Sequence, residues 1–343
     1  MKTKQLIFVT LITIISFVCF GLMVRNFDTL SRYPYDNDTA RELIKEYLIK
    51  DEIEYIIEYS IEPNYFIRFI AAEDFNIYHS DVYNEIDQLS WDLGPHDIVE
   101  LVEDSYGQYS IDEISDLLAV YSGITVHDWV SNRSDFDLNA TLSTNPYAYD
   151  TMLNDQITVF TTNAINLEVI DPSYHLKEDD LLLNAEALTY LEAMCAVISE
   201  ELEITPCGGL YIDAAYRSYN DEMVIYKQAL SNGYTIADYD LPGHSEHQLG
   251  LAIDFTVNGE GVEDFNATVQ GQWLLDHAYL YGFTQTYSEG TRQYTGKNPR
   301  NEHYRFFGVD LATQIKGPIL NDEVDEENDL VEEDEFLDEE IEG

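Results

Sequence analysis

The sequence predicts an α+β fold for the C-terminal half of the chain, preceded by a mostly helical region and by one transmembrane helix. Three observations lead to this prediction. An uncharged run lies near the N-terminus, apolar residues recur at spacings of three and four in the region that follows, and short alternating segments occur in the second half. We therefore expect a small antiparallel sheet with flanking helices in the C-terminal domain.

The N-terminal run extends from Gln5 to Val24 and contains 20 residues without a charge. At a rise of about 1.5 Å per residue, a helix of this length would cross a hydrocarbon core of about 30 Å. Lys2 and Lys4 precede it, so residues 1–4 are expected in the cytoplasm and the chain beyond Arg25 outside. A cleaved signal peptide is the alternative. Because the run is long and no small-x-small site follows it, we expect an uncleaved single-pass membrane anchor with an extracytoplasmic C-terminal domain.

The rest of the chain divides by pattern into three further parts. Residues 25–140 are expected to form a helical stalk domain, because apolar positions have helical spacing in 40–59 and 110–121. The Asn-, Ser- and Asp-rich stretch 131–145 is the natural linker. The second domain is expected over 141–318, and 319–343 form an acidic tail that cannot bury a core and is predicted to be disordered.

The composition excludes one class of partner and leaves the cysteines open. The formal net charge is −49, so binding to nucleic acid is not expected. Cys19 lies in the apolar run, whereas Cys195 and Cys207 lie in the second domain. A disulfide between these two is conceivable outside the cell, and two buried free thiols are equally compatible with the sequence.

The segment Ser245–Asp254, SEHQLGLAID, indicates a metal site. It places His247 and Asp254 seven residues apart across a glycine-containing turn. An imidazole and a carboxylate can jointly hold Zn²⁺, and a third nitrogen ligand would leave one coordination position open for water. The alternative is a turn that leads into a buried strand, in which His247 is merely hydrogen-bonded.

This segment, Ser-x-His-x-x-Gly-x-Ala-x-Asp, resembles the metal-binding segment of the VanY-type D-alanyl-D-alanine carboxypeptidases. The resemblance extends from about Asn163 to Ile315 and includes Tyr216-Arg217-Ser218 and the closing stretch NEHYRFFGVDLATQI. It implies that His303 is the third ligand beside His247 and Asp254. It also implies a zinc peptidase that removes a terminal D-Ala from the stem peptides of peptidoglycan.

The resemblance suggests roles for three further residues. Arg217 is expected to stabilise a developing oxyanion or to hold a terminal carboxylate by a two-pronged contact. Ser245 is expected either to cap the turn or to bind substrate. Glu222 stands where the family usually has Gln, and a carboxylate that faced the substrate there would repel a terminal carboxylate.

The catalytic base is where the chain departs from the family. The family has Glu three residues before its last His, and this position is Arg300. Glu302 would point to the same side as Arg300 if the segment were extended, and could then take over as base. Two alternatives to a carboxypeptidase stay open. One is a peptidoglycan endopeptidase, and the other is a catalytically weak wall-binding pseudoenzyme.

Overall fold

The computed structural model describes residues 3–27, 29–133 and 137–315. The chain forms two compact units, Met1–Arg133 and Ser134–Gly343. This division lies ahead of the boundary that we predicted at residue 140. The predicted acidic tail, 319–343, lies outside the described residues, so its predicted disorder stays a prediction.

The chain begins with α1 (Thr3–Phe27), which covers the predicted transmembrane segment Gln5 to Val24. Within the described part of the chain, no helix has both the length and the apolar character needed to span a membrane. The prediction of a transmembrane anchor is therefore not supported.

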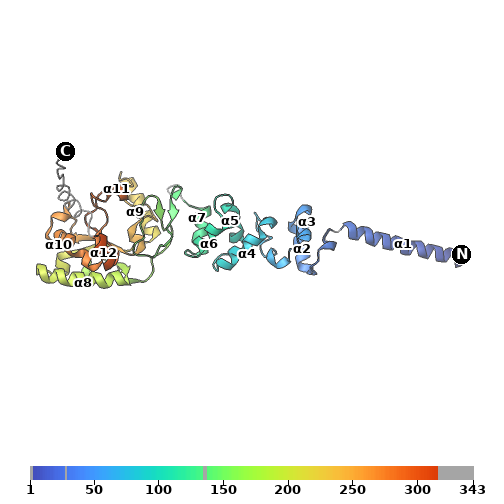
Figure 1. Cartoon of the computed structure of the whole chain (residues 1–343), viewed down its shortest axis with the longest axis horizontal. Helices are drawn as coiled ribbons and strands as arrows, with labels where there is room; N and C mark the ends of the chain where they lie inside the picture. Colours follow the sequence, from blue (N-terminus) through green and yellow to red (C-terminus); the bar gives the residue numbers. More distant parts are fainter. Residues whose placement is uncertain (1–2, 28, 134–136, 316–343) are drawn as a thin grey trace, which may run out of the picture. The chain divides into compact units, whose positions relative to one another are not determined.

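The rest of the first unit is helical, and both segments with helical spacing form helices (Figure 1). In α6, Ser110 caps the first turn by accepting a hydrogen bond from the Glu113 amide, and Glu113 in turn accepts one from the Ser110 amide at 2.7 Å. The helices after η1 (Thr29–Arg32) are α2 (Asp38–Tyr47), α3 (Lys50–Glu58), α4 (Ser80–Leu89), α5 (Pro95–Ser105), α6 (Ile111–Leu118) and α7 (Gly123–Ser131).

The second unit contains the predicted small antiparallel sheet, so the α+β prediction is confirmed for this unit. Its four strands have the order β5-β6-β8-β7, and every neighbouring pair is antiparallel. They are β5 (Leu210–Ala214), β6 (Ala252–Val257), β7 (Phe283–Gln285) and β8 (His303–Phe306). Two-stranded pairings join β1 (Thr141–Leu142) to β2 (Ile157–Thr158) and β3 (Leu167–Val169) to β4 (Leu182–Asn184).

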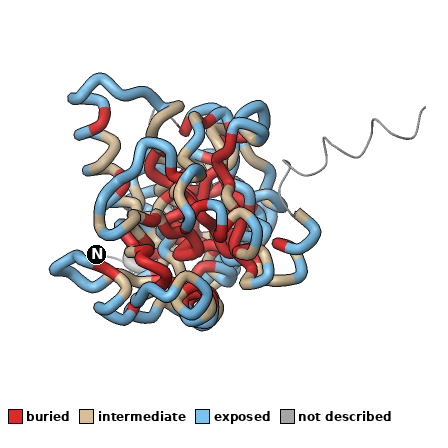
Figure 2. Tube along the Cα trace, turned by 90° about the vertical axis from the view of Figure 1, so that its left-hand side faces the viewer, coloured by how far each residue is buried: buried red, intermediate tan, exposed pale blue. Residues whose placement is uncertain are grey.

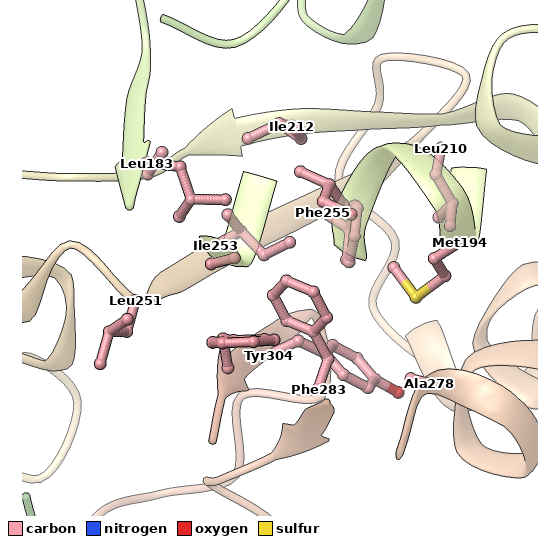
Figure 3. Packing of buried hydrophobic residues seen from close by; sticks show 14 of the residues in the cluster. Leu183, Met194, Leu210, Ile212, Leu251, Ile253, Phe255, Ala278, Phe283 and Tyr304 are labelled. Carbon is pink, nitrogen blue, oxygen red and sulfur yellow. The ribbon is translucent and has the colours of Figure 1, made fainter. Parts of the chain in front are cut away.

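The core of this unit lies between the sheet and α8 (Ala185–Leu202). Figure 3 shows Ile253 and Phe255 of β6 beside Tyr304 of β8, together with Met194 of α8. The other helices are α9 (Tyr219–Ser231), α10 (Val269–His277), α11 (Arg292–Thr295) and α12 (Val309–Ile315). In Figure 2, buried positions (red) gather toward the middle of the trace and exposed positions (pale blue) lie toward its outside.

The apolar face that the sequence predicts for α8 is buried, including Leu188, Leu191 and Ile198. Cys195 on this face forms a disulfide with Cys207, which precedes β5. The structure thus decides between the two alternatives that the sequence left open. The bond ties the long helix to the start of the strand that leads to Arg217.

Candidate metal centre

The sheet register brings two of the predicted ligands together. Asp254 of β6 lies directly opposite His303, the first residue of β8. Residues opposite each other in an antiparallel pair are cross-strand neighbours on one face of the sheet. The spacing of 49 residues in the sequence is thereby reduced to a contact of 2.7 Å between Asp254 Oδ1 and His303 Nδ1.

His247 reaches the same place from the 3₁₀ turn η7 (Glu246–Leu249), which precedes β6. Ser245 caps this turn by accepting a hydrogen bond from the His247 amide at 3.3 Å. Gly250 ends the turn with φ near 70°, a left-handed conformation that glycine adopts without strain. An added Cβ at Gly250 would lie 2.7 Å from the Leu167 side chain and 2.9 Å from that of Ala164.

The ring of His247 is held in one orientation and one tautomer. Its Nδ1 donates a hydrogen bond to the Ala215 carbonyl at 2.7 Å, just beyond the end of β5. The other nitrogen, Nε2, is buried without a hydrogen-bond partner and lies 3.2 Å from Asp254 Oδ2. A buried nitrogen lone pair beside a carboxylate is the arrangement that metal-ligating histidines show.

The structure therefore brings together all three predicted ligands, His247, Asp254 and His303. One donor atom from each lies within 4.8 Å of the others. Both histidines are fully buried, whereas the Asp254 side chain is 22% exposed, so the group faces solvent on the carboxylate side. Two imidazoles and one carboxylate form a donor set that Zn²⁺ accepts, and three protein ligands leave a fourth position free.

A further carboxylate, which the sequence analysis missed, orients His303. Glu246 is fully buried, and its Oε2 accepts a hydrogen bond from His303 Nε2 at 3.0 Å. Its second oxygen accepts one from the buried Arg305 at 2.8 Å. This leaves Nδ1 of His303 to face Asp254 and the metal position, as a carboxylate behind a ligating histidine does. The position of Glu246 next to His247 was the sequence feature that could have identified it.

The pKa values of the two histidines shift in opposite directions. Burial, with Arg217 nearby, lowers the pKa of His247 to about 4, so its imidazole is neutral at pH 7. Burial alone would also lower the pKa of His303, but its hydrogen bonds to Asp254 and Glu246 outweigh burial and raise it. His247 is therefore ready to bind a cation, whereas at His303 protonation competes more strongly with binding of a cation.

The three residues with predicted substrate roles lie together beside this group. Arg217 donates to Glu222 Oε1 at 3.2 Å and to Asp254 Oδ2 at 3.1 Å. Ser245, besides capping the turn, donates to Glu222 Oε1 at 2.7 Å. Glu222 is buried, and burial raises its pKa although Arg217 and Ser245 act against this. Arg217 thus links the metal ligand to a buried carboxylate.

Arg300, at the position where the family has its base, is held in a network of its own. Its guanidinium donates to the buried Asp240 at 2.9 Å and lies 4.0 Å from the centre of the Tyr287 ring. Burial would lower the pKa of Arg300, but the Asp240 carboxylate outweighs burial and raises it, so the side chain stays charged. Asp240 also faces the buried Lys297 at 3.6 Å. Together, Arg300, Asp240 and Lys297 form a group that we call the Asp240 network.

The prediction that Glu302 shares one side with Arg300 rests on an extended segment, and that premise is wrong. Residues 301–302 form a turn, closed by a hydrogen bond from the His303 amide to the Arg300 carbonyl at 3.0 Å. Side chains two apart in a turn do not alternate as they do in a strand. Glu302 itself is half-buried, and its carbonyl accepts a hydrogen bond from the Phe255 amide.

Comparison with known proteins places this site within one family segment. Residues 180–309, which contain His247, Asp254 and His303, match the family model VanY, described as D-alanyl-D-alanine carboxypeptidase. The predicted resemblance is confirmed. The VanY-like segment includes the sheet and α8 to α11.

Among curated relatives, a D-alanyl-D-alanine carboxypeptidase of Enterococcus faecalis is 31% identical over 121 residues, which are 31% of this chain and 44% of the relative. A second relative is VanXYC of Enterococcus gallinarum, a bifunctional D-Ala-D-Ala dipeptidase and D-Ala-D-Ala carboxypeptidase. It is 27% identical over 140 residues, which are 38% of this chain and 70% of VanXYC. The solved LdcB LD-carboxypeptidase is 26% identical with a TM-score of 0.47, covering 54% of this chain and 87% of that one. The chain spans less than half the length of the first relative.

Proposed function

We propose that the second unit is a zinc-dependent hydrolase of the D-alanyl-D-alanine carboxypeptidase type that acts on peptidoglycan stem peptides. The observation that carries this proposal is the buried group His247, Asp254 and His303, in which each histidine is oriented by a second hydrogen bond. The group lies inside the VanY-like segment, and the Enterococcus faecalis relative is named for this activity.

The residues fit the metal that the family implies. His247 Nε2 is an unpartnered buried donor, and Glu246 keeps Nδ1 of His303 directed at the same point. When bound there, Zn²⁺ would supply an acidified water and polarise the carbonyl of the scissile bond. Arg217 lies against Asp254, so its guanidinium can donate to a substrate oxygen next to the metal position.

One observation favours a different substrate on the same scaffold. Glu222 engages the guanidinium of Arg217 and would repel a terminal carboxylate that approached it. A peptide without a free terminal carboxylate would escape this repulsion, so an endopeptidase is our second candidate. Hydrolysis of matched stem peptides that end in D-Ala-D-Ala, free or amidated, distinguishes the two. Faster cleavage of the free peptide supports the carboxypeptidase, and faster cleavage of the amidated one supports the endopeptidase.

Zinc dependence is tested with the full chain and one ligand variant. We expect His247→Ala to lose both hydrolysis and the zinc bound at this centre, whereas His277→Ala, a histidine on α10 outside the centre, should keep both. Zinc content and turnover are measured on the same preparations. Hydrolysis that survives chelation and the His247→Ala change would contradict the proposal.

The identity of the catalytic base is tested by changing the charge of Glu302 or of Arg300. If Glu302 carries the proton, Glu302→Gln should lower turnover by roughly 10²–10⁴ and leave zinc bound. Arg300 at the base position instead favours a wall-binding protein with little turnover. In that case wild type and Glu302→Gln should be equally slow, and Arg300→Glu should increase hydrolysis. Brisk turnover that Glu302→Gln does not change would contradict both versions.

We also propose that the second unit functions outside the cytoplasm. The disulfide between Cys195 and Cys207 supports this location, because such bonds persist in oxidising compartments. Peptidoglycan, the proposed substrate, is also extracytoplasmic. Protease added to intact cells should digest the second unit, and full protection until the cells are lysed would contradict the proposed location.

A further inference from the structure

Residues 137–162 lie ahead of the VanY-like segment, but they hold the turn that carries His247. Before the turn, the Gly243 carbonyl accepts a hydrogen bond from the Thr158 hydroxyl at 2.8 Å. Within the turn, the buried Gln248 side chain donates to two backbone carbonyls of the same segment. The backbone on both sides of His247 is therefore fixed by a part of the chain that the family model does not include.

His244, which directly precedes the capping Ser245, is held at both ring nitrogens. Its Nδ1 lies 2.7 Å from the Asn154 carbonyl oxygen, and its Nε2 lies 3.1 Å from Asp137 Oδ1. The side chains of His244 and Asp137 are both fully buried. Asp137 comes from the stretch 131–145, which the sequence suggests as a linker. An imidazole that is buried and hydrogen-bonded at both nitrogens has a single orientation, so Asp137 helps to fix this ring.

The backbone connects His244 to the metal centre. Ser245 follows it and accepts a hydrogen bond from the amide of His247, a proposed ligand, at 3.3 Å. Glu246 comes next and orients His303, a second proposed ligand. A movement of His244 would therefore displace the cap, one ligand and the carboxylate behind another. Because metal–ligand distances vary by only about 0.2 Å, such a displacement should weaken metal binding.

We propose that Asp137 is a positioning residue of the metal centre, which acts through His244 and does not itself bind the metal. The inference rests on the proposed function, because it requires that His247, Asp254 and His303 hold zinc. A role in folding alone would make loss of Asp137 lower stability. A positioning role also lowers the zinc affinity of the folded protein, because its ligands are less well arranged. The functional domain would then include residues ahead of the VanY-like segment.

The experiment measures the zinc affinity of the full chain by competition with a chelator. Asp137→Ala removes the carboxylate from His244, so we expect the affinity to fall about tenfold, at the low end for residues that orient metal ligands. Asp137→Ser also breaks the contact but leaves a polar group, and it should weaken binding even if Asp137→Ala does not fold. Asp137→Asn can donate its amide N–H to Nε2 of His244 and should restore most of the affinity.

Gln270→Ala is the matched control. Gln270 is also buried, and its side chain donates to the Gly208 carbonyl ahead of β5 at 2.9 Å. Its loss should lower the free energy of unfolding of the metal-free protein in urea and leave the zinc affinity unchanged. Circular dichroism verifies folding of every variant.

Three results would overturn the inference while the proposed function stands. They are wild-type affinity in folded Asp137→Ala or Asp137→Ser, no restoration in Asp137→Asn, and equal weakening by Gln270→Ala. A wild type that binds no zinc would refute the proposed function together with the inference. None of these results depends on hydrolysis.

Discussion

The two sides of the C-terminal metal centre are built with opposite charges. On the ligand side, the buried Glu246 carboxylate and the Ala215 carbonyl orient two imidazoles toward one point. On the side where the resemblance places the family's base, the half-buried Arg300 pairs with Asp240 and lies over the Tyr287 ring. The proposed metal ligands and the proposed proton-transfer position thus belong to separate groups of residues. In this chain the first group is assembled, and Arg300 occupies the position that the resemblance assigns to the base.

The largest effect is expected from breaking the Asp240 network. In Asp240→Asn, Arg300 loses its buried carboxylate partner and Lys297 keeps only its pair with Asp155, and breaking a buried ion pair by removing one partner costs about 3–5 kcal/mol of stability. Urea unfolding of the metal-free protein measures this. Asp238→Asn is the matched control, because Asp238 lies two residues away and is more exposed. A loss as small as that of the control would show that the network is dispensable.

The same network predicts a loss of stability in acid. Burial would raise the pKa of Asp240, but Arg300 and Lys297 outweigh burial and lower it from 3.8 to about 2. Because the folded-state pKa is the lower one, this carboxylate stabilises the fold fully above pH 3.8 and loses that contribution as the pH falls toward 2. Unfolding free energies between pH 6 and 2.5 should therefore fall more steeply in wild type than in Asp240→Asn. Parallel curves would disprove the assigned shift.

A smaller effect is expected on the ligand side. Glu246→Gln keeps an oxygen for the hydrogen bond from His303 but removes the charge, which should weaken zinc binding about 10–100-fold. Competition titration with a chelator measures the affinity of the C-terminal centre. Glu302→Gln, a change next to His303 but in the turn, should leave that affinity unchanged. Equal affinity in wild type and Glu246→Gln would show that the second hydrogen bond is unimportant.

The smallest effect concerns substrate selection. Glu222→Gln removes the charge that engages Arg217, so the KM for a peptide with a free terminal carboxylate should fall by a factor of about ten or less. The KM for the amidated peptide should stay the same. An identical change for both peptides would mean that Glu222 acts on the fold of the site and not on the terminal carboxylate.

The sequence predicted the ligand side better than the base side, and the reason is physical. His247 and Asp254 are joined by a short turn and a strand, so their spacing is nearly a local property. The pairing of β6 with β8, which brings His303 opposite Asp254, was accessible only through the family resemblance. The roles of Glu246 and Asp240 depend on side chains that meet from distant segments. A local sequence pattern does not encode such contacts. It also did not predict the turn at residues 301–302.

The glycine that ends the η7 turn is expected to tolerate substitution far less than a glycine elsewhere in the same unit. Gly250 combines a left-handed backbone with side chains that an added Cβ would touch at 2.7 and 2.9 Å, and it lies four residues before Asp254. Gly261 has neither constraint, since nothing lies within 4 Å of its added Cβ. In a saturation library selected for zinc retention, position 250 should accept glycine almost exclusively, whereas position 261 should accept most amino acids. Evolution of this centre is therefore restricted by a residue that binds no metal.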